Sequence, residues 1–164
     1  MLSFVARPAL GCAAVALCLE VLSAARRADP IRKVESRARP RASGRSVWDS
    51  VYTAAQATRG DSLYRVTCSK CHGATLGGGT TDTGDEAPPL AGPGFQSNWN
   101  GMSLGEVYEK VRNGMPPDNP KTIDPKVIVD VMAYMMSQNK FPAGASELTA
   151  EIDKLRDIKI APKP

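Results

Sequence analysis

The chain has 164 residues, a formal net charge of +4 and a hydrophobic content of 42 %, which fits one folded domain with extensions and excludes a wholly disordered protein. The positive charge is uneven. Residues 26–47 hold eight basic and two acidic residues, a net charge of +6, whereas residues 50–164 hold twelve basic and thirteen acidic residues, a net charge of −1. The nearly neutral C-terminal part gives no basis for nucleic-acid binding.

The first 25 residues have the pattern of a secretory signal peptide. Arg7 precedes an apolar run from Ala9 to Leu22, and the small residues Ser23, Ala24 and Ala25 follow it. We therefore predict a signal peptide at 1–25, cleaved after Ala25. A retained N-terminal anchor is the alternative, although the apolar run is shorter than the ~20 residues of a membrane span.

Residues 26–49 are predicted to be a basic, flexible linker, because they combine proline, serine and glycine with few large apolar side chains. The basic segment 26–47 has two interpretations. It is either a solvated tail or an arm that associates weakly with an anionic membrane surface.

Residues 50–142 are predicted to be the folded domain, which opens with a helix. Thr53 and Gln56 have the spacing of a capping box, and the residues up to about Cys68 favour a helix. Gly60 in mid-helix costs about 1 kcal/mol relative to alanine, so we expect another helix to approach closely there.

The motif Cys68-Ser69-Lys70-Cys71-His72 follows this helix. Two cysteines three positions apart with a histidine directly behind them are typical of covalent attachment of a c-type haem. The alternatives are a redox-active cysteine pair, two of four zinc ligands, or a structural disulfide. Outside the signal segment only Cys68, Cys71 and His72 are available as preferred zinc ligands, so a carboxylate would have to complete a zinc site.

The rest of the domain is predicted to hold a long loop and two more helices. Residues 73–101 are rich in glycine, proline, threonine and aspartate and are expected to be a loop around a bound haem. A second capping box at Ser103 starts a helix that Asn113-Gly114 ends. Asp124 and Pro125 start a third, which ends near Phe141. Residues 143–164 are predicted to be an extension with a weak amphipathic helix.

His72 is the only histidine of the chain, so one iron cannot have two histidine ligands. A methionine is then the expected sixth ligand. Met132, Met135 and Met136 fit core packing of the third helix. Met115, which two prolines follow and hold in a stiff turn, is favoured over Met102.

Residues 51–140 resemble the class I cytochromes c of the periplasmic bacterial type. The resemblance rests on Gly60 and Tyr64, the Cys68–His72 motif, Pro88-Pro89-Leu90, Met115-Pro116 and Tyr134. It implies an all-α fold of about three to five helices with long loops around one covalent haem c and its iron. It also implies that the Pro88 carbonyl accepts a hydrogen bond from His72, and that Leu90 packs on the haem.

Three further side chains are candidate donors to the haem carboxylates: Trp99, Tyr108 and Arg112. Each also has a simpler explanation, as a core or solvated helix residue.

The resulting functional hypothesis is a periplasmic monohaem electron carrier, not an enzyme. We expect a monomer that exchanges electrons with redox-partner proteins, a donor dehydrogenase and an acceptor oxidase or reductase. One alternative is a haem subunit bound tightly to an oxidoreductase such as a quinoprotein dehydrogenase, by analogy with similar domains. Another is a gas-binding or peroxidatic haem protein, which requires that Met115 does not ligate the iron or is easily displaced.

Overall fold

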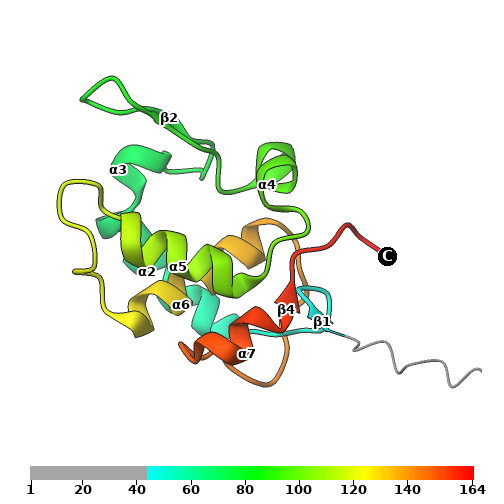
Figure 1. The fold of residues 1–164 in the computed structure, drawn as a ribbon. Helices are drawn as coiled ribbons and strands as arrows, with labels where there is room; N and C mark the ends of the chain where they lie inside the picture. Colours follow the sequence, from blue (N-terminus) through cyan, green and yellow to red (C-terminus); the bar gives the residue numbers. More distant parts are fainter. Residues whose placement is uncertain (1–43) are drawn as a thin grey trace, which may run out of the picture. The chain divides into compact units, whose positions relative to one another are not determined.

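The computed structural model describes residues 44–164, which form six helices and four two-residue strands (Figure 1). The predicted signal peptide and most of the predicted linker lie outside the described residues. The helices are α2 (Ala54–Thr67), α3 (Ser69–His72), α4 (Gly92–Trp99), α5 (Leu104–Gly114), α6 (Pro125–Gln138) and α7 (Ile152–Arg156). The strands are β1 (Arg45–Ser46), β2 (Gly79–Thr80), β3 (Glu86–Ala87) and β4 (Ile158–Lys159).

The largest helix–helix contact joins α2 to α6. At the crossing, a Cβ on Gly60 would collide with the backbone carbonyl of Asp130 and would lie 2.9 Å from the Cβ of Tyr134. The ring of Tyr64, one turn further along α2, lies 5.4 Å from the ring of Tyr134 between centroids. The close approach predicted for Gly60 is therefore present, because only glycine lets the two backbones come this near.

The predicted helix starts are correct, with one difference in detail. Ser103 and Glu106 form a complete capping box on α5, and Asp124 caps α6 with Pro125 in the first turn. The Thr53 hydroxyl accepts a hydrogen bond from Gln56 N at 3.1 Å, but the Gln56 side chain does not reach back to Thr53. It is instead fully buried and bonded to Asp130 and to both backbone groups of Leu148.

Both ends of the described chain belong to the packed domain. Strand β1 pairs in parallel with β4, and the Trp48 indole donates to the Ala161 carbonyl at 2.9 Å. The apolar side chains of both segments are buried in the one core, among them Val47, Val51, Leu155 and Ile160. For residues 45–49 the predicted linker is therefore wrong. In the predicted C-terminal extension a short helix, α7, is present, and it contributes Leu155 to the core, as the flanking residues contribute Leu148, Ile158 and Ile160.

Residues 73–101 are also more ordered than the predicted loop. They contain the antiparallel pair β2–β3 and the helix α4, which buries Phe95. The described domain thus has six helices where three to five were expected. Local composition gave no signal for α4, since its first turn is Gly-Pro-Gly.

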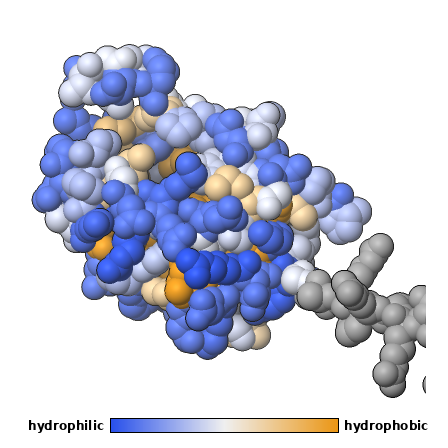
Figure 2. Space-filling view, in the orientation of Figure 1, coloured by the Kyte–Doolittle hydropathy of each residue, from blue (hydrophilic) through white to orange (hydrophobic). Residues whose placement is uncertain are grey.

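The surface is mostly hydrophilic on the face seen in Figure 2, with small apolar areas between polar ones. Among residues 44–164, no helix is both long and apolar enough to cross a membrane.

Candidate functional site

The cysteine–histidine motif forms a single helical turn directly behind α2. Cys68 caps the end of α2 and the start of α3, and the backbone amides of Cys71 and His72 both donate to the Cys68 carbonyl, at 3.2 and 3.0 Å. This turn holds two half-buried, free thiols and one imidazole within five residues. The arrangement suits a planar group that is attached at two points and ligated from one face.

The alternatives for the two cysteines find little support. Burial raises the pKa of the Cys68 thiol; the hydroxyl of Thr67, 3.2 Å from its sulfur, lowers it and Cys71 raises it further. A raised pKa is the opposite of what a redox-active cysteine pair needs. Among residues 44–164, moreover, no cluster of three or more His, Cys, Asp and Glu side chains is suited to a metal ion such as zinc.

His72 is oriented by a backbone carbonyl. Its Nδ1 lies 3.0 Å from the Pro88 oxygen, and the residue is only 8 % exposed. Because a carbonyl oxygen can only accept, Nδ1 carries the proton, and Nε2 is left with its lone pair to bind a metal. The contact is the one that the resemblance implied.

The segment that presents Pro88 is fixed by close backbone contacts. The Tyr64 hydroxyl donates to the Gly73 carbonyl at 2.6 Å, and Gly78 N donates to the His72 carbonyl at 3.0 Å. Gly78 has φ +76°, and a Cβ there would lie 2.9 Å from Pro89 N and 3.0 Å from the Pro88 carbonyl carbon. Sequence reasoning did not single out Gly78, although three consecutive glycines, five to seven residues after His72, were a visible signal of such an approach.

Leu90 is buried at the end of this segment. Its amide donates to the Leu76 carbonyl at 2.8 Å, and its carbonyl accepts from the Asn139 side chain at 3.0 Å. Asn139, just beyond α6, also accepts from Gly92 N at 3.0 Å. This asparagine ties α6 to the Pro88–Leu90 segment, and nothing in its local sequence predicted that role.

Met115 ends α5. It is half-buried in an extended conformation, and its amide donates to Val111 O at 2.9 Å. Met102 lies before the other end of α5, where its carbonyl accepts from Ile160 N at 2.8 Å. The two candidate sixth ligands are therefore separated by the length of α5, about 16 Å.

The three candidate donors lie on α4 and α5. Arg112 donates to the Tyr108 hydroxyl at 3.3 Å, and Tyr108 is buried. Trp99 stacks on Phe95, and the ammonium of Lys110 lies 5.9 Å from its ring centroid.

The Trp99 indole nitrogen is buried and has no hydrogen-bond partner in the structure. A buried donor without an acceptor is costly, by about 1–3 kcal/mol. An acceptor such as a haem carboxylate would satisfy it. The buried donor, the free thiols and the carbonyl-bound histidine are thus chemically suited to haem.

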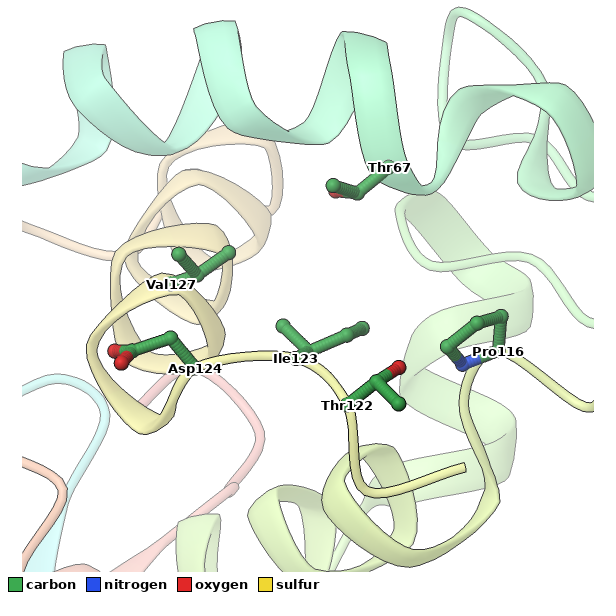
Figure 3. Close-up of a pocket in the computed structure, with 6 residues that line it drawn as sticks. All are labelled: Thr67, Pro116, Thr122, Ile123, Asp124 and Val127. Atoms are coloured by element: carbon green, nitrogen blue, oxygen red, sulfur yellow. The ribbon is translucent and has the colours of Figure 1, made fainter. Parts of the chain in front are cut away.

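A hollow of about 390 Å³ lies beside the motif, lined by Thr67, Pro116, Thr122, Ile123, Asp124 and Val127 (Figure 3). We call it the apolar hollow. Thr67 is the neighbour of Cys68 in the chain, and Pro116 is the neighbour of Met115. The hollow therefore lies between the segment that carries the two thiols and the segment that carries Met115, the favoured sixth ligand.

Comparison with known proteins gives one match. Residues 55–135 match the family model described as cytochrome c oxidase, cbb3-type, subunit III. No curated protein and no solved structure matches the chain significantly. The matched range includes the motif, Pro88, Leu90, the three candidate donors and Met115.

Proposed function

Since residues 55–135 belong to the class I monohaem c-type cytochromes, we propose that the protein is an exported single-electron carrier. Cytochrome domains of this kind bind haem c covalently through cysteine sulfurs and transfer electrons. In this chain Cys68 and Cys71 would attach the haem, and the His72 imidazole and the Met115 sulfur would bind its iron. The bound iron supplies reversible one-electron oxidation and reduction.

The orientation of His72 carries this proposal. The Pro88 carbonyl, 3.0 Å from Nδ1, fixes the tautomer and increases the basicity of Nε2. Burial of the ring restricts water at that nitrogen. Because His72 is the only histidine, the opposite ligand is of another type, and a methionine sulfur stabilises the reduced iron.

The remaining site residues hold the edges of the haem. Leu90 would pack against the haem, and Trp99, Tyr108 and Arg112 would donate hydrogen bonds to its carboxylates. The unpartnered indole nitrogen of Trp99 supports this role most directly. For Tyr108 and Arg112 the support is their mutual hydrogen bond, which leaves further guanidinium N–H groups free to donate.

We further propose that the mature protein is a periplasmic monomer that shuttles electrons between a donor dehydrogenase and an acceptor oxidase or reductase. With both His72 and Met115 bound to it, the iron would have no open site for substrate, which supports a carrier over an enzyme.

A spectrum of the purified mature protein in both oxidation states, together with its intact mass, tests this function. We expect the mass of the chain from residue 26 plus one haem, and the spectrum of a six-coordinate c-type cytochrome. A haem that organic solvent extracts, or a mass without haem, would contradict covalent attachment.

The matched family model supports a second candidate, because its description names a subunit of an oxidase. The protein would then act as the haem subunit of a larger oxidoreductase, a quinoprotein dehydrogenase among the candidates. Size-exclusion chromatography of the protein from its native membrane and periplasmic fractions separates the two. A free carrier elutes as a monomer, whereas a subunit remains with its partner at low concentration.

A further inference from the structure

The Pro88 carbonyl, which accepts the hydrogen bond from His72 Nδ1 at 3.0 Å, belongs to a segment with few anchors of its own. Pro88 is exposed, so packing of its ring contributes little to its position. Neither Pro88 nor Pro89 has a backbone N–H group to donate. The position of this carbonyl therefore depends on the hydrogen bonds of the residues that follow the two prolines.

Those residues are held from two sides. Leu90 N donates to the Leu76 carbonyl at 2.8 Å, but Leu76 is only four residues from His72, so this bond is internal to the loop. Asn139 Nδ2 donates to the Leu90 carbonyl at 3.0 Å, and Asn139 Oδ1 accepts from Gly92 N at 3.0 Å. Because Asn139 directly follows α6, these two bonds fix the segment to the packed pair of α2 and α6.

The Asn139 amide is itself oriented by the end of α6. Its Nδ2 also donates to the Met135 carbonyl at 2.8 Å, and its backbone N–H donates to the same carbonyl at 3.1 Å. A residue that only ended the helix would need neither the bond to Leu90 nor the bond to Gly92. With them, both N–H groups and the oxygen of the side-chain amide are in use.

We propose that Asn139 is a positioning residue of the iron site, which keeps the Pro88 carbonyl within hydrogen-bond distance of His72. It acts through the backbone of Leu90. The proposal rests on the proposed electron-transfer function and adds to the site a residue outside the matched range 55–135. When haem is bound, a firm bond to Nδ1 makes the imidazole a stronger electron donor, which favours oxidised iron. Release of the segment weakens that bond and favours reduced iron.

The variants Asn139→Leu and Asn139→Ala test this role. Leucine keeps the volume of asparagine without its hydrogen-bonding groups, alanine removes both, and neither adds a charge near the iron. Ser137→Ala is the matched control. Ser137 lies in the last turn of α6, and its hydroxyl donates to the Tyr134 carbonyl at 2.7 Å, within the helix.

Two quantities are measured on the holoprotein. NMR of the reduced protein gives the rate at which the His72 Nδ1 proton exchanges with solvent, and a redox titration gives the reduction potential. The absorption spectrum and denaturant unfolding of each variant check the iron ligands and the fold.

The sign of the change in potential separates positioning from general loosening of the fold. Loosening that only lets water reach the iron lowers the reduction potential, because water stabilises the additional positive charge of the oxidised state. A weaker bond to His72 raises the potential instead, because the imidazole becomes a poorer electron donor.

We expect the Nδ1 proton of both Asn139 variants to exchange at least about fivefold faster than in the wild type, because two hydrogen bonds that hold the segment are lost. At the wild-type midpoint potential, the ratio of reduced to oxidised protein should rise about two- to threefold. In Ser137→Ala both quantities should stay within about 1.5-fold of the wild type.

Three results would overturn the positioning proposal alone. These are Asn139 variants that match Ser137→Ala in both quantities, a lowered potential in the Asn139 variants, and a wild-type Gly92 amide that exchanges as fast as in an unfolded peptide. The last of these needs no variant. A wild-type protein without covalent haem would instead overturn the proposed function, and this proposal with it.

Discussion

Two side chains set the redox behaviour of the proposed site at the scale of single residues. His72 is positioned before any metal binds, because its ring is buried and its Nδ1 is committed to the Pro88 carbonyl. Met115 is positioned by backbone alone, at the end of α5 and in front of a proline. A substitution at Met115 would therefore remove the proposed ligand with little effect on the helix that precedes it.

Substitution Met115→Ala is expected to abolish the sulfur-to-iron charge-transfer band of the oxidised protein and to lower the reduction potential, because the thioether stabilises the ferrous state. Reduced Met115→Ala should also bind carbon monoxide rapidly. Absorption spectroscopy and a redox titration measure these effects. Met102→Ala is the control and should retain the band; persistence of the band in Met115→Ala would exclude Met115 as the ligand.

Asp130 is a second residue whose chemistry gives a testable result. Burial alone would raise the pKa of its carboxyl group, but hydrogen bonds from Arg59, Gln56 and Lys126 outweigh burial and lower the pKa. A group whose pKa is lower in the folded state stabilises the fold above its unfolded pKa, about 3.9 for aspartate. That contribution is lost as the pH falls through the folded pKa.

Asp130→Asn is therefore expected to reduce the free energy of unfolding at pH 7 by about 1–3 kcal/mol, since it weakens the acceptor of three donors. The difference from the wild type should narrow as the pH falls below about 4. Urea denaturation at several pH values measures it. Asp153→Asn, at a side chain that is 93 % exposed, should change little; a difference that does not vary with pH would contradict the lowered pKa.

At the scale of helices, the close contact between α2 and α6 gives a prediction about stability. Gly60→Ala is expected to destabilise the domain by about 1–3 kcal/mol or more, because its Cβ meets the backbone of Asp130 and the two helices must separate. Denaturant unfolding of the oxidised holoprotein measures the loss.

Gly114→Ala provides the matched control in a helix. A Cβ on Gly114 meets no atom within 4 Å, so alanine there should be neutral or stabilise the fold by up to about 1 kcal/mol. Equal stability of the two variants would mean that α2 and α6 do not pack as closely as the structure describes.

The same elements explain how much the sequence could predict. Helices α2, α5 and α6 each start at a capping residue, Thr53, Ser103 and Asp124. The side chain of each bonds to a backbone amide two or three residues further on, so the sequence alone predicted these starts. The Cys68–His72 motif is equally local. Helix α4 and the β1–β4 pair depend on partners far away in the chain, and two-residue strands have no periodicity to detect.

The role of Gln56 illustrates the same limit within the core. Its spacing from Thr53 predicted a capping box, which is a local interaction. The structure shows instead that its side chain bonds with Leu148, 92 residues away. For the site, the His72–Pro88 contact came only from family resemblance, and Asn139 and Gly78 were missed because their partners are distant or specific to the fold.

The whole domain depends on segments outside the matched family range. Leu155 is 1 % exposed, and α7, which carries it, packs against α5. Leu155→Ala is therefore expected to cost about 2–5 kcal/mol of stability, as measured by thermal or denaturant unfolding. Val66→Ala, at an exposed side chain, should stay within about 0.5 kcal/mol of the wild type. A similarly small effect of Leu155→Ala would mean that residues 148–160 are an appendage.

The parallel pairing of β1 with β4 makes this domain suitable for circular permutation. Because Arg45 lies opposite Ile158, the segments near the two ends of the described chain lie side by side, and proteins whose ends are close commonly accept circular permutation. A short glycine-serine linker from Pro164 to Gly44, with new ends opened in the exposed turn at Thr83–Gly84, would keep every helix intact. The order in which the helices are synthesised would change, while the haem-attachment turn would keep its surroundings.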